Sequence, residues 1–296
     1  MINLHIKKMI FAFILIPALI LTSGVMSSCG GKNVPGIIIT GSTSVQPYAE
    51  ILAEEYAHLS KKDPEKYPEF KIDVLGGGSS AGIQAAEAGT ADIGMSSRAL
   101  KPTELYKDPE AEVLELKLIT YEIAKDGLAI IINPGNIIDD LSLEQVRKIY
   151  TGEITNWSEL GGHDAKIHVS TREEGSGTRS AFEDLVMNKE RITPKAIVQD
   201  SNGSIRLFVS DDIDSIGFIS LGLVEPKKGQ KEVKAIKLEG VEATEENIIN
   251  GSYNLRRSFL FVTLPEPSEK VKKFIDFVLS PEGQQILKHE GLIPNN

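Results

Sequence analysis

The chain has 296 residues, of which 42 are acidic and 32 are Lys or Arg, so its formal net charge is −10 at pH 7. This acidic balance argues against binding nucleic acid or an anionic membrane surface through net charge, but not against a small anion in a locally positive pocket. The length corresponds to one large domain or two ordinary ones.

The first thirty residues have the layout of a secretory signal. Lys7 and Lys8 precede an apolar run at residues 9–21, and small residues follow up to Cys29. A membrane-spanning helix needs about 20 apolar residues, so the run predicts a cleaved signal peptide over residues 1–28 rather than an anchor helix. We therefore expect the protein to be exported.

Cys29 is the single cysteine, so it cannot form an internal disulfide. Residues 25–30 resemble a bacterial lipobox, with Met26 where Leu is usual. The resemblance implies that Cys29 becomes the acylated first residue, that residues 29–33 form a lipidated linker, and that the protein is lipid-anchored at the outer face of the bacterial cell membrane or facing the periplasm. The alternative is a free thiol near the cleavage site.

Two strand–loop–helix units come next. Residues 36–39 predict a buried strand, GSTS follows at 41–44, and apolar residues then recur at helical spacing over residues 48–59. Apolar residues alternate over residues 70–74, GGGSSAG follows at 76–82, and a second helix begins near residue 83. Two such units in succession predict a parallel α/β sheet.

The second half repeats this pattern. Strands are predicted at residues 114–121 and 128–132, and the Asn-Pro-Gly-Asn turn at 133–136 is the predicted first crossover between two lobes. A helix over 143–150, a strand over 167–170 and REEGSGT at 172–178 lead into a third helix near residue 182. Strands at 216–219 and 259–262 and helices at 271–279 and 284–288 complete the chain.

The three loops rich in Gly, Ser and Thr lie between a strand and a helix, so their backbone N–H groups and helix dipoles can converge on one anion. Only three cations lie in or beside them, namely Arg98, Arg172 and Arg179. Arg172 is separated from Gly175 by two residues, a spacing that can aim its planar guanidinium at the same oxygens as the loop amides.

Two other motif matches have a weaker physical basis. Residues 76–81 fit the dinucleotide pattern G-x-G-x-x-A, but Asp92 is closer than the usual spacing and an exported protein meets little NAD. Residues 78–82 fit the nucleophile elbow G-x-S-x-G, with Ser80 as the candidate nucleophile. The later histidines, His163, His168 and His289, are expected to be surface or packing residues. No metal-binding or P-loop pattern occurs, so no cofactor is expected.

A set of motifs carries a family resemblance. GSTSVQP, GGGSSAG, TADIGMSSR, YTGEITNWSELGG, REEGSGTR and SIGFISLG occur in this order, and they resemble the phosphate-binding proteins of ABC phosphate importers, the PstS-like group. The resemblance implies a type II periplasmic-binding-protein fold, in which two lobes, each a mainly parallel sheet flanked by helices, close on one phosphate in the cleft. It also implies a monomer that is not an enzyme and that passes phosphate to a permease and ATPase complex.

Carried over residue by residue, the resemblance implies a set of ligand-binding residues: Thr43, Ser44, the Val45 amide, Ser79, Arg172, Ser176, Gly177 and Thr178. Ser97 stands where some members of the family have an aspartate that accepts the proton of monohydrogen phosphate. Here the acceptor is left open among Glu174, a serine oxygen and a backbone carbonyl, as is the role of Arg98.

The lobes are expected to comprise residues 34–133 plus 255–296 and residues 134–254, joined by two crossovers that permit hinge closure. Three alternatives stay open. The alternative functions are a receptor for sulfate or molybdate, an exported serine hydrolase using Ser80, and an adhesin or sensor that has kept the fold but no longer binds the ligand.

Overall fold

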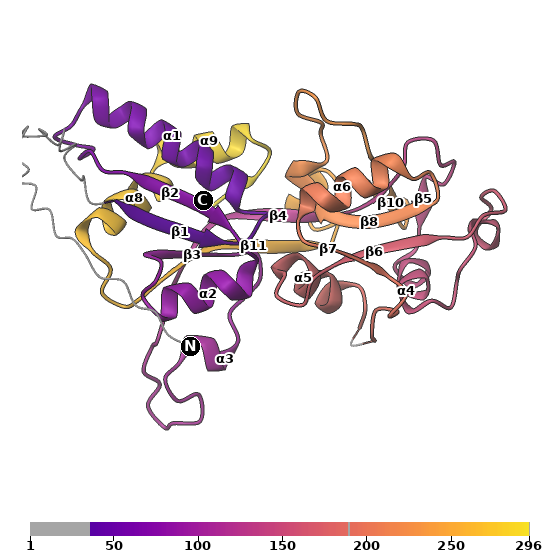
Figure 1. Ribbon diagram of the computed structural model, residues 1–296, viewed down its shortest axis with the longest axis horizontal. Helices are drawn as coiled ribbons and strands as arrows, with labels where there is room; N and C mark the ends of the chain where they lie inside the picture. Colours follow the sequence, from indigo (N-terminus) through magenta and orange to yellow (C-terminus); the bar gives the residue numbers. More distant parts are fainter. Residues whose placement is uncertain (1–35, 189, 296) are drawn as a thin grey trace, which may run out of the picture. The chain divides into compact units, whose positions relative to one another are not determined.

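The computed structural model describes residues 36–188 and 190–295. Within them the chain forms an α/β structure whose main sheet has the strand order β2-β1-β3-β11-β4-β8-β6-β7. Figure 1 shows helices on both faces of this sheet. The predicted signal peptide (residues 1–28) and Cys29 lie outside the described residues. None of the described helices is both long enough and apolar enough to cross a bilayer.

The first lobe contains the first two predicted strand–loop–helix units and the C-terminal helices. Its central strand β1 runs parallel to both β2 and β3. Its core packs Ile39 and Tyr56 against Phe274 and Phe277. The elements are β1 (Ile37–Gly41), α1 (Gln46–Lys62), β2 (Ile72–Gly76), α2 (Ser79–Glu87), β3 (Ile93–Ser96), α3 (Pro102–Leu105), α8 (Glu269–Leu279), α9 (Pro281–His289) and β12 (Ile293–Pro294).

The second lobe has its own core, in which the rings of Phe182 and Phe218 stack with centroids 4.2 Å apart beside Tyr150 and the fully buried Trp157. β6 is parallel to β7 and to β8. The elements are β5 (Asp140–Leu141), α4 (Leu143–Thr151), η1 (Trp157–Leu160), β6 (His168–Arg172), α5 (Gly177–Leu185), β7 (Ile197–Gln199), α6 (Asn202–Asp211), β8 (Ser215–Ser220), η2 (Leu221–Leu223), β9 (Lys234–Ala235), β10 (Lys237–Leu238) and α7 (Glu245–Ile249).

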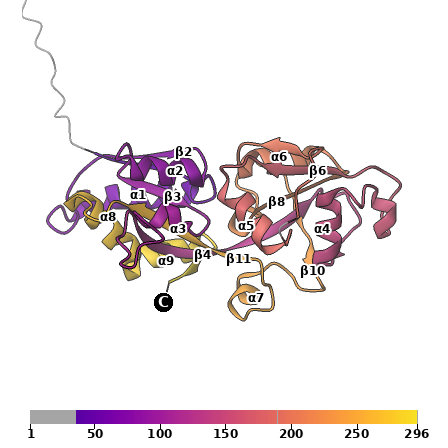
Figure 2. The same cartoon turned by 90° about the horizontal axis from the view of Figure 1, so that it is seen from below.

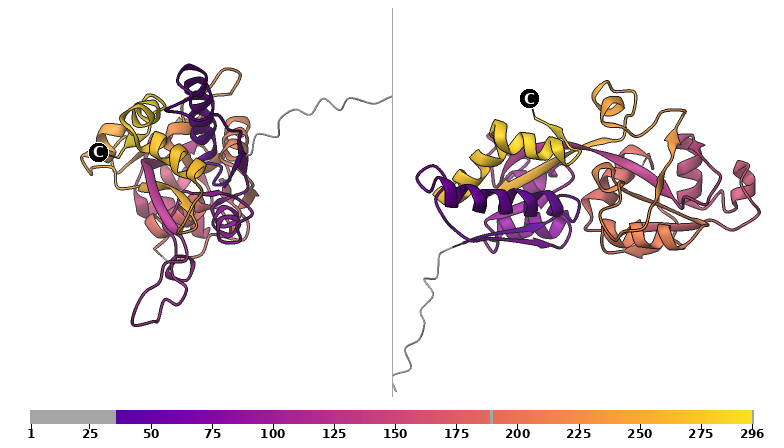
Figure 3. Two further views of the ribbon diagram at one scale, coloured as in Figure 1. Left: turned by 90° about the vertical axis from the view of Figure 1, so that its left-hand side faces the viewer. Right: turned by 90° about the horizontal axis from the view of Figure 1, so that it is seen from above.

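Two antiparallel strands, β4 (Ile119–Ile132) and β11 (Arg256–Thr263), connect the lobes. β4 pairs with β11 through residues 119–127 and with β8 through residues 128–132. Ala124 therefore lies in the first core and Leu128 in the second. Figures 2 and 3 show both strands running between the two groups of elements.

The continuity of β4 corrects one prediction. Residues 114–121 and 128–132 were expected to be separate strands, but residues 119–132 form one strand, and 114–118 precede it. The polar interruption that suggested two strands includes Asp126, which is buried and forms an ion pair with Arg257 of β11. The first crossover consequently lies inside β4 and not at the turn of residues 133–136, whose Asn133 bonds to the second lobe.

The remaining fold predictions agree with the structure. All three strand–loop–helix units are present, and the predicted α/β fold of two lobes is confirmed. We propose that the second crossover lies near residue 255. The packing of Leu255 in the second core and of Phe259 in the first supports this position.

Candidate anion-binding site

Four helices begin within one region. α1, α2, α5 and α6 each follow a strand and a short loop, and their first backbone N–H groups have no partner within their own helix. Contacts between loops bring these ends together: Ser44 Oγ lies 2.7 Å from Thr178 Oγ1, and Asn202 Nδ2 donates to Ser44 Oγ at 2.9 Å. Because each helix N-terminus carries a partial positive charge, their convergence favours an anion.

Serine hydroxyls of the first lobe form a buried cluster at this place. Ser42 Oγ donates to Ser97 Oγ at 2.9 Å, and the Ser97 amide donates to Ser79 Oγ at 3.0 Å. Gly177 of the second lobe approaches so closely that a Cβ there would lie 2.2 Å from Ser79 Oγ. Hydroxyl groups can donate or accept, so this cluster can contact both protonated and unprotonated oxygens.

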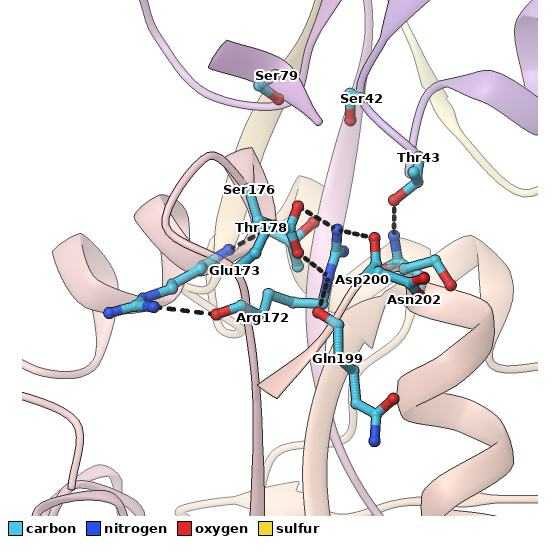
Figure 4. A network of polar contacts seen from close by, with 12 residues as sticks. Ser42, Thr43, Ser79, Arg172, Glu173, Ser176, Thr178, Gln199, Asp200 and Asn202 are labelled. Atoms are coloured by element: carbon cyan, nitrogen blue, oxygen red, sulfur yellow. Dashed lines mark hydrogen bonds and ion pairs between the residues drawn. The ribbon is translucent and has the colours of Figure 1, made fainter. Parts of the chain in front are cut away.

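Arg172 supplies the charge. It ends β6, and its Nε and Nη2 donate to Glu173 and to the carbonyls of Gln199 and Asp200 (Figure 4). Its Nη1 has no hydrogen-bond partner within residues 36–188 and 190–295, although the residue is only 1% exposed. Burial lowers the pKa of Arg172, and the carboxylate of Glu173 opposes this shift. A bound anion would satisfy the unpartnered donor and also oppose the shift.

The predicted ligand residues are largely brought together. Hydrogen bonds and the close approach of Gly177 join six of them, namely Thr43, Ser44, Ser79, Ser97, Gly177 and Thr178, directly or through one neighbour. Arg172 bonds to Glu173 and to the carbonyls of Gln199 and Asp200. Two others are already engaged: the Val45 amide donates to the Ser42 carbonyl at 3.1 Å, and Ser176 caps α5 by accepting from the Arg179 amide at 3.2 Å. A pocket of 140 Å³ adjoins the site, lined by residues of both lobes that include Thr43 and Asn202.

The two charged residues left open by the sequence, Arg98 and Glu174, make other contacts. Arg98 forms an ion pair with Glu104 at 2.8 Å and also donates to Ser80 Oγ. Glu174 is exposed and lines a separate surface pocket with Arg179. Glu174 is therefore removed from the candidates for the acceptor of a phosphate proton.

Several residues of the site were missed from the sequence. Asn202 is the first residue of α6, in a fourth strand–loop–helix unit. The residues around it, Asp200, Ser201 and Gly203, are typical of a turn and a helix start, and this local pattern could have predicted the unit. Arg257 gave no such signal, because its Nη2 reaches Ser44 Oγ, at 3.2 Å, only through the pairing of β11 with β4.

The surroundings of Ser80 differ from those of a catalytic serine. Its Oγ accepts from Arg98 Nη2 at 3.1 Å, whereas His163 and His168 pair with Asp214 and Asp212 of the second lobe. Among the described residues no group of three His, Cys, Asp or Glu side chains could hold a metal ion.

Comparisons with known proteins agree with this geometry. A family model of the PBP superfamily domain matches residues 27–282. The phosphate-binding protein PstS of Bacillus subtilis is 28% identical over 270 residues, which are 90% of this chain and 84% of the relative. The phosphate-binding protein PstS of Staphylococcus haemolyticus is 33% identical over 254 residues, which are 82% of this chain and 76% of the relative.

Two solved structures are also similar. A putative phosphate ABC transporter substrate-binding protein from Clostridium perfringens, with bound phosphate, is 43% identical with a TM-score of 0.78, and the match covers 88% of this chain and 100% of that one. An ABC-type phosphate transport receptor from Vibrio cholerae is 37% identical with a TM-score of 0.68 and the same coverage.

Proposed function

Because this chain belongs to the PstS-like phosphate-binding proteins of the PBP superfamily, we propose that it captures inorganic phosphate outside the cytoplasm and delivers it to the permease and ATPase complex of an ABC-type phosphate importer. The relatives named above are phosphate-binding or phosphate-transport proteins. The prediction that the chain is not an enzyme is confirmed by this membership.

The unpartnered Nη1 of Arg172 carries the proposal. A buried guanidinium nitrogen without an acceptor is costly, and a charge-assisted hydrogen bond to a phosphate oxygen would remove that cost. Arg172 ends β6, and α5 begins at Gly177, five residues later, so an anion bound by Arg172 is also expected to meet the amides of Gly177 and Thr178. The hydroxyls of Ser44 and Thr178, which now bond to one another, can each turn to an anion.

The ligand set that we propose is the one expected from the sequence, with two changes of role. Ser176 holds the start of α5, and the Val45 amide holds the turn before α1, through the hydrogen bonds described above. The residues proposed to contact phosphate are Thr43, Ser44, Ser79, Ser97, Arg172, Gly177 and Thr178.

Selectivity for phosphate over sulfate depends on an acceptor for the phosphate proton. With Glu174 on the surface, the neutral cluster of Ser42, Ser79 and Ser97 is the best-placed candidate. A hydroxyl accepts this proton but can also donate to an unprotonated oxygen, so it rejects sulfate less strongly than a carboxylate would. A receptor for sulfate or molybdate is therefore the second candidate function.

Thermal unfolding of the purified, anion-free protein with phosphate, sulfate or molybdate tests both candidates. Phosphate at one hundred times its Kd is expected to add about 2.7 kcal/mol to the free energy of unfolding. A comparable increase with sulfate would favour the broader oxyanion receptor. No increase with any of the three would contradict the proposed function and favour an adhesin or sensor that has lost the ligand.

We also propose that the protein acts as a monomer anchored through an acylated Cys29 at the outer face of the cell membrane or facing the periplasm. The support is the lipobox-like segment before Cys29 and the short apolar run that precedes it. Labelling of growing cells with radioactive palmitate is expected to mark the wild-type chain but not Cys29→Ser, which should be released from the membrane fraction. Membrane retention of the unlabelled variant would contradict the anchor.

A further inference from the structure

Arg257 occupies an unusual place for a buried cation. It lies on β11, directly opposite Asp126 of β4, on the two strands that connect the lobes. The guanidinium is 5.2 Å from the ring centroid of Phe259, and Arg257 is 7% exposed. A buried charge at this position needs specific partners.

Its nitrogens are only partly satisfied. Nε and Nη2 donate to Asp126 Oδ2 at 3.0 and 2.9 Å, and Nη2 also donates to Ser44 Oγ at 3.2 Å. Nη1 has no partner within the described part of the chain. Because Ser44 is bonded to Thr178, the free nitrogen belongs to a side chain that already touches the proposed phosphate ligands.

Arg172 and Arg257 therefore share a property. Among the described residues each is buried, has one carboxylate partner, and has an Nη1 without a hydrogen-bond partner. Arg257 also acts on Arg172: burial lowers the pKa of Arg172, and the charge of Arg257 lowers it further. A dianion would satisfy both nitrogens and relieve the repulsion between the two cations.

We propose that Arg257 is a second anion-binding arginine of this site, and that it links the bound anion directly to the strands about which the lobes move. The proposal rests on the proposed function. It differs from the loop-borne contacts because the donor comes from a connecting strand. An anion held by both arginines would join the second-lobe strand β6 to the connecting strand β11.

Asp126 acts as a positioning residue for Arg257. Its Oδ1 accepts from Ser220 Oγ at 2.8 Å, and its carboxylate also accepts from the Gly222 amide. Burial raises the pKa of Asp126, and Arg257 opposes this shift. With these acceptor positions taken, the carboxylate fixes the direction of the guanidinium and does not itself face the ligand.

Calorimetric titration of the purified protein with inorganic phosphate tests the proposal. The main variant is Arg257→Gln with Asp126→Asn, which removes both charges together and leaves no unpaired buried ion. The matched control is Arg98→Gln with Glu104→Gln, which removes an Arg–carboxylate pair of the first lobe whose arginine is buried and whose carboxylate is partly buried. Loss of a charge-assisted hydrogen bond is expected to weaken phosphate binding by about tenfold to a hundredfold in the main variant, against less than about twofold in the control.

Folding is checked separately, by the thermal midpoint of each variant without phosphate. If the main variant does not fold, Arg257→Lys decides, because lysine keeps the charge opposite Asp126 but lacks a second nitrogen to face the site. Wild-type affinity in the folded double variant, or in Arg257→Lys when the double variant fails to fold, would overturn the proposal. Failure of the wild-type protein to bind phosphate would instead reject the proposed function and this inference with it.

Discussion

Gly177 is a residue at which the two lobes approach one another closely within the site. An added Cβ would lie 2.2 Å from Ser79 Oγ and 2.6 Å from Ser97 Oγ, closer than real Cβ contacts allow. Its φ is not positive, so alanine suits the first turn of α5 at least as well as glycine.

Gly177→Ala is therefore expected to weaken phosphate binding more than about tenfold, or about 1.4 kcal/mol, without lowering the stability of the anion-free protein. Titration calorimetry and thermal unfolding measure the two quantities. Gly175→Ala is the matched control, because its added Cβ would lie 3.8 Å from the nearest atom. Equal affinity in both variants would show that the loops need not approach this closely.

The Arg98–Glu104 pair allows a prediction about acid stability. Burial raises the pKa of Glu104, but hydrogen bonds from Arg98 and from the Lys101 amide outweigh it, so the pKa lies below the ordinary 4.5. A lowered pKa contributes stability that is present above the unfolded value and is lost as pH falls through the folded value.

Glu104→Gln is accordingly expected to lose about 1–3 kcal/mol at pH 7 and to lack part of the wild-type decrease below about pH 4.5. Urea unfolding at a series of pH values from neutral to acidic measures both. An unchanged slope of stability against pH in the variant would mean that Glu104 does not titrate differently in the folded state.

Among single residues, the sequence predicted those ligand-binding residues whose role is indicated by the residues next to them in the chain. Arg172 and Thr178 flank one Gly- and Ser-rich loop, and Ser79 follows glycines at a strand end, so the local pattern and the family resemblance led to their prediction as ligand residues. Arg257 is different, because its meaning depends on pairing with Asp126, 131 residues away. The residues around Arg257 do not reveal that β11 pairs with β4, and this pairing is what places Arg257 opposite Asp126.

Among the elements, α6 completes the site. Ser201 caps it by accepting from the Ser204 amide at 3.0 Å, and Asn202 then reaches Ser44 and the Ser220 amide. The sequence did not predict this helix, because the strand before it, β7, is short and the apolar residues of β7 are exposed.

Ser201→Ala is expected to destabilise the protein by about 1 kcal/mol through loss of the cap, and to weaken phosphate binding because Asn202 loses its fixed position. Denaturant unfolding gives the first quantity and calorimetry the second. Ser210→Ala, in the last turn of the same helix, should change neither strongly, since within the described residues its hydroxyl bonds only to the Leu207 carbonyl. Faster amide exchange at residues 204–206 in Ser201→Ala alone would locate the effect.

β4 shows why element boundaries were harder to predict than element types. The apolar run of residues 128–132 was recognised, but Glu122, Lys125 and Asp126 interrupt the pattern before it. Burial of Asp126 against Arg257 keeps these residues within one strand. A long-range ion pair thus outweighed a local signal.

For the whole molecule, phosphate is expected to hold the lobes together. Without an anion, Arg172 and Arg257 repel one another and the contacts between Ser44 and Thr178 join only neutral groups. Small-angle X-ray scattering should therefore give a smaller radius of gyration with phosphate than without. Superimposable scattering curves would contradict hinge closure. An equal decrease of the radius of gyration in Gly177→Ala would show that the absence of a side chain at residue 177 is not needed for closure.

The strand order has a consequence for how this chain folds. β11 lies between β3 and β4 in the sheet, yet it is synthesised after the entire second lobe. The paired strands of the second lobe come from residues 128–238, whereas the sheet of the first lobe stays incomplete until residues 256–263 are available. Contacts so distant in sequence form slowly. Refolding is expected to end with a late step, the insertion of one C-terminal strand into the middle of a sheet begun by the N-terminal half.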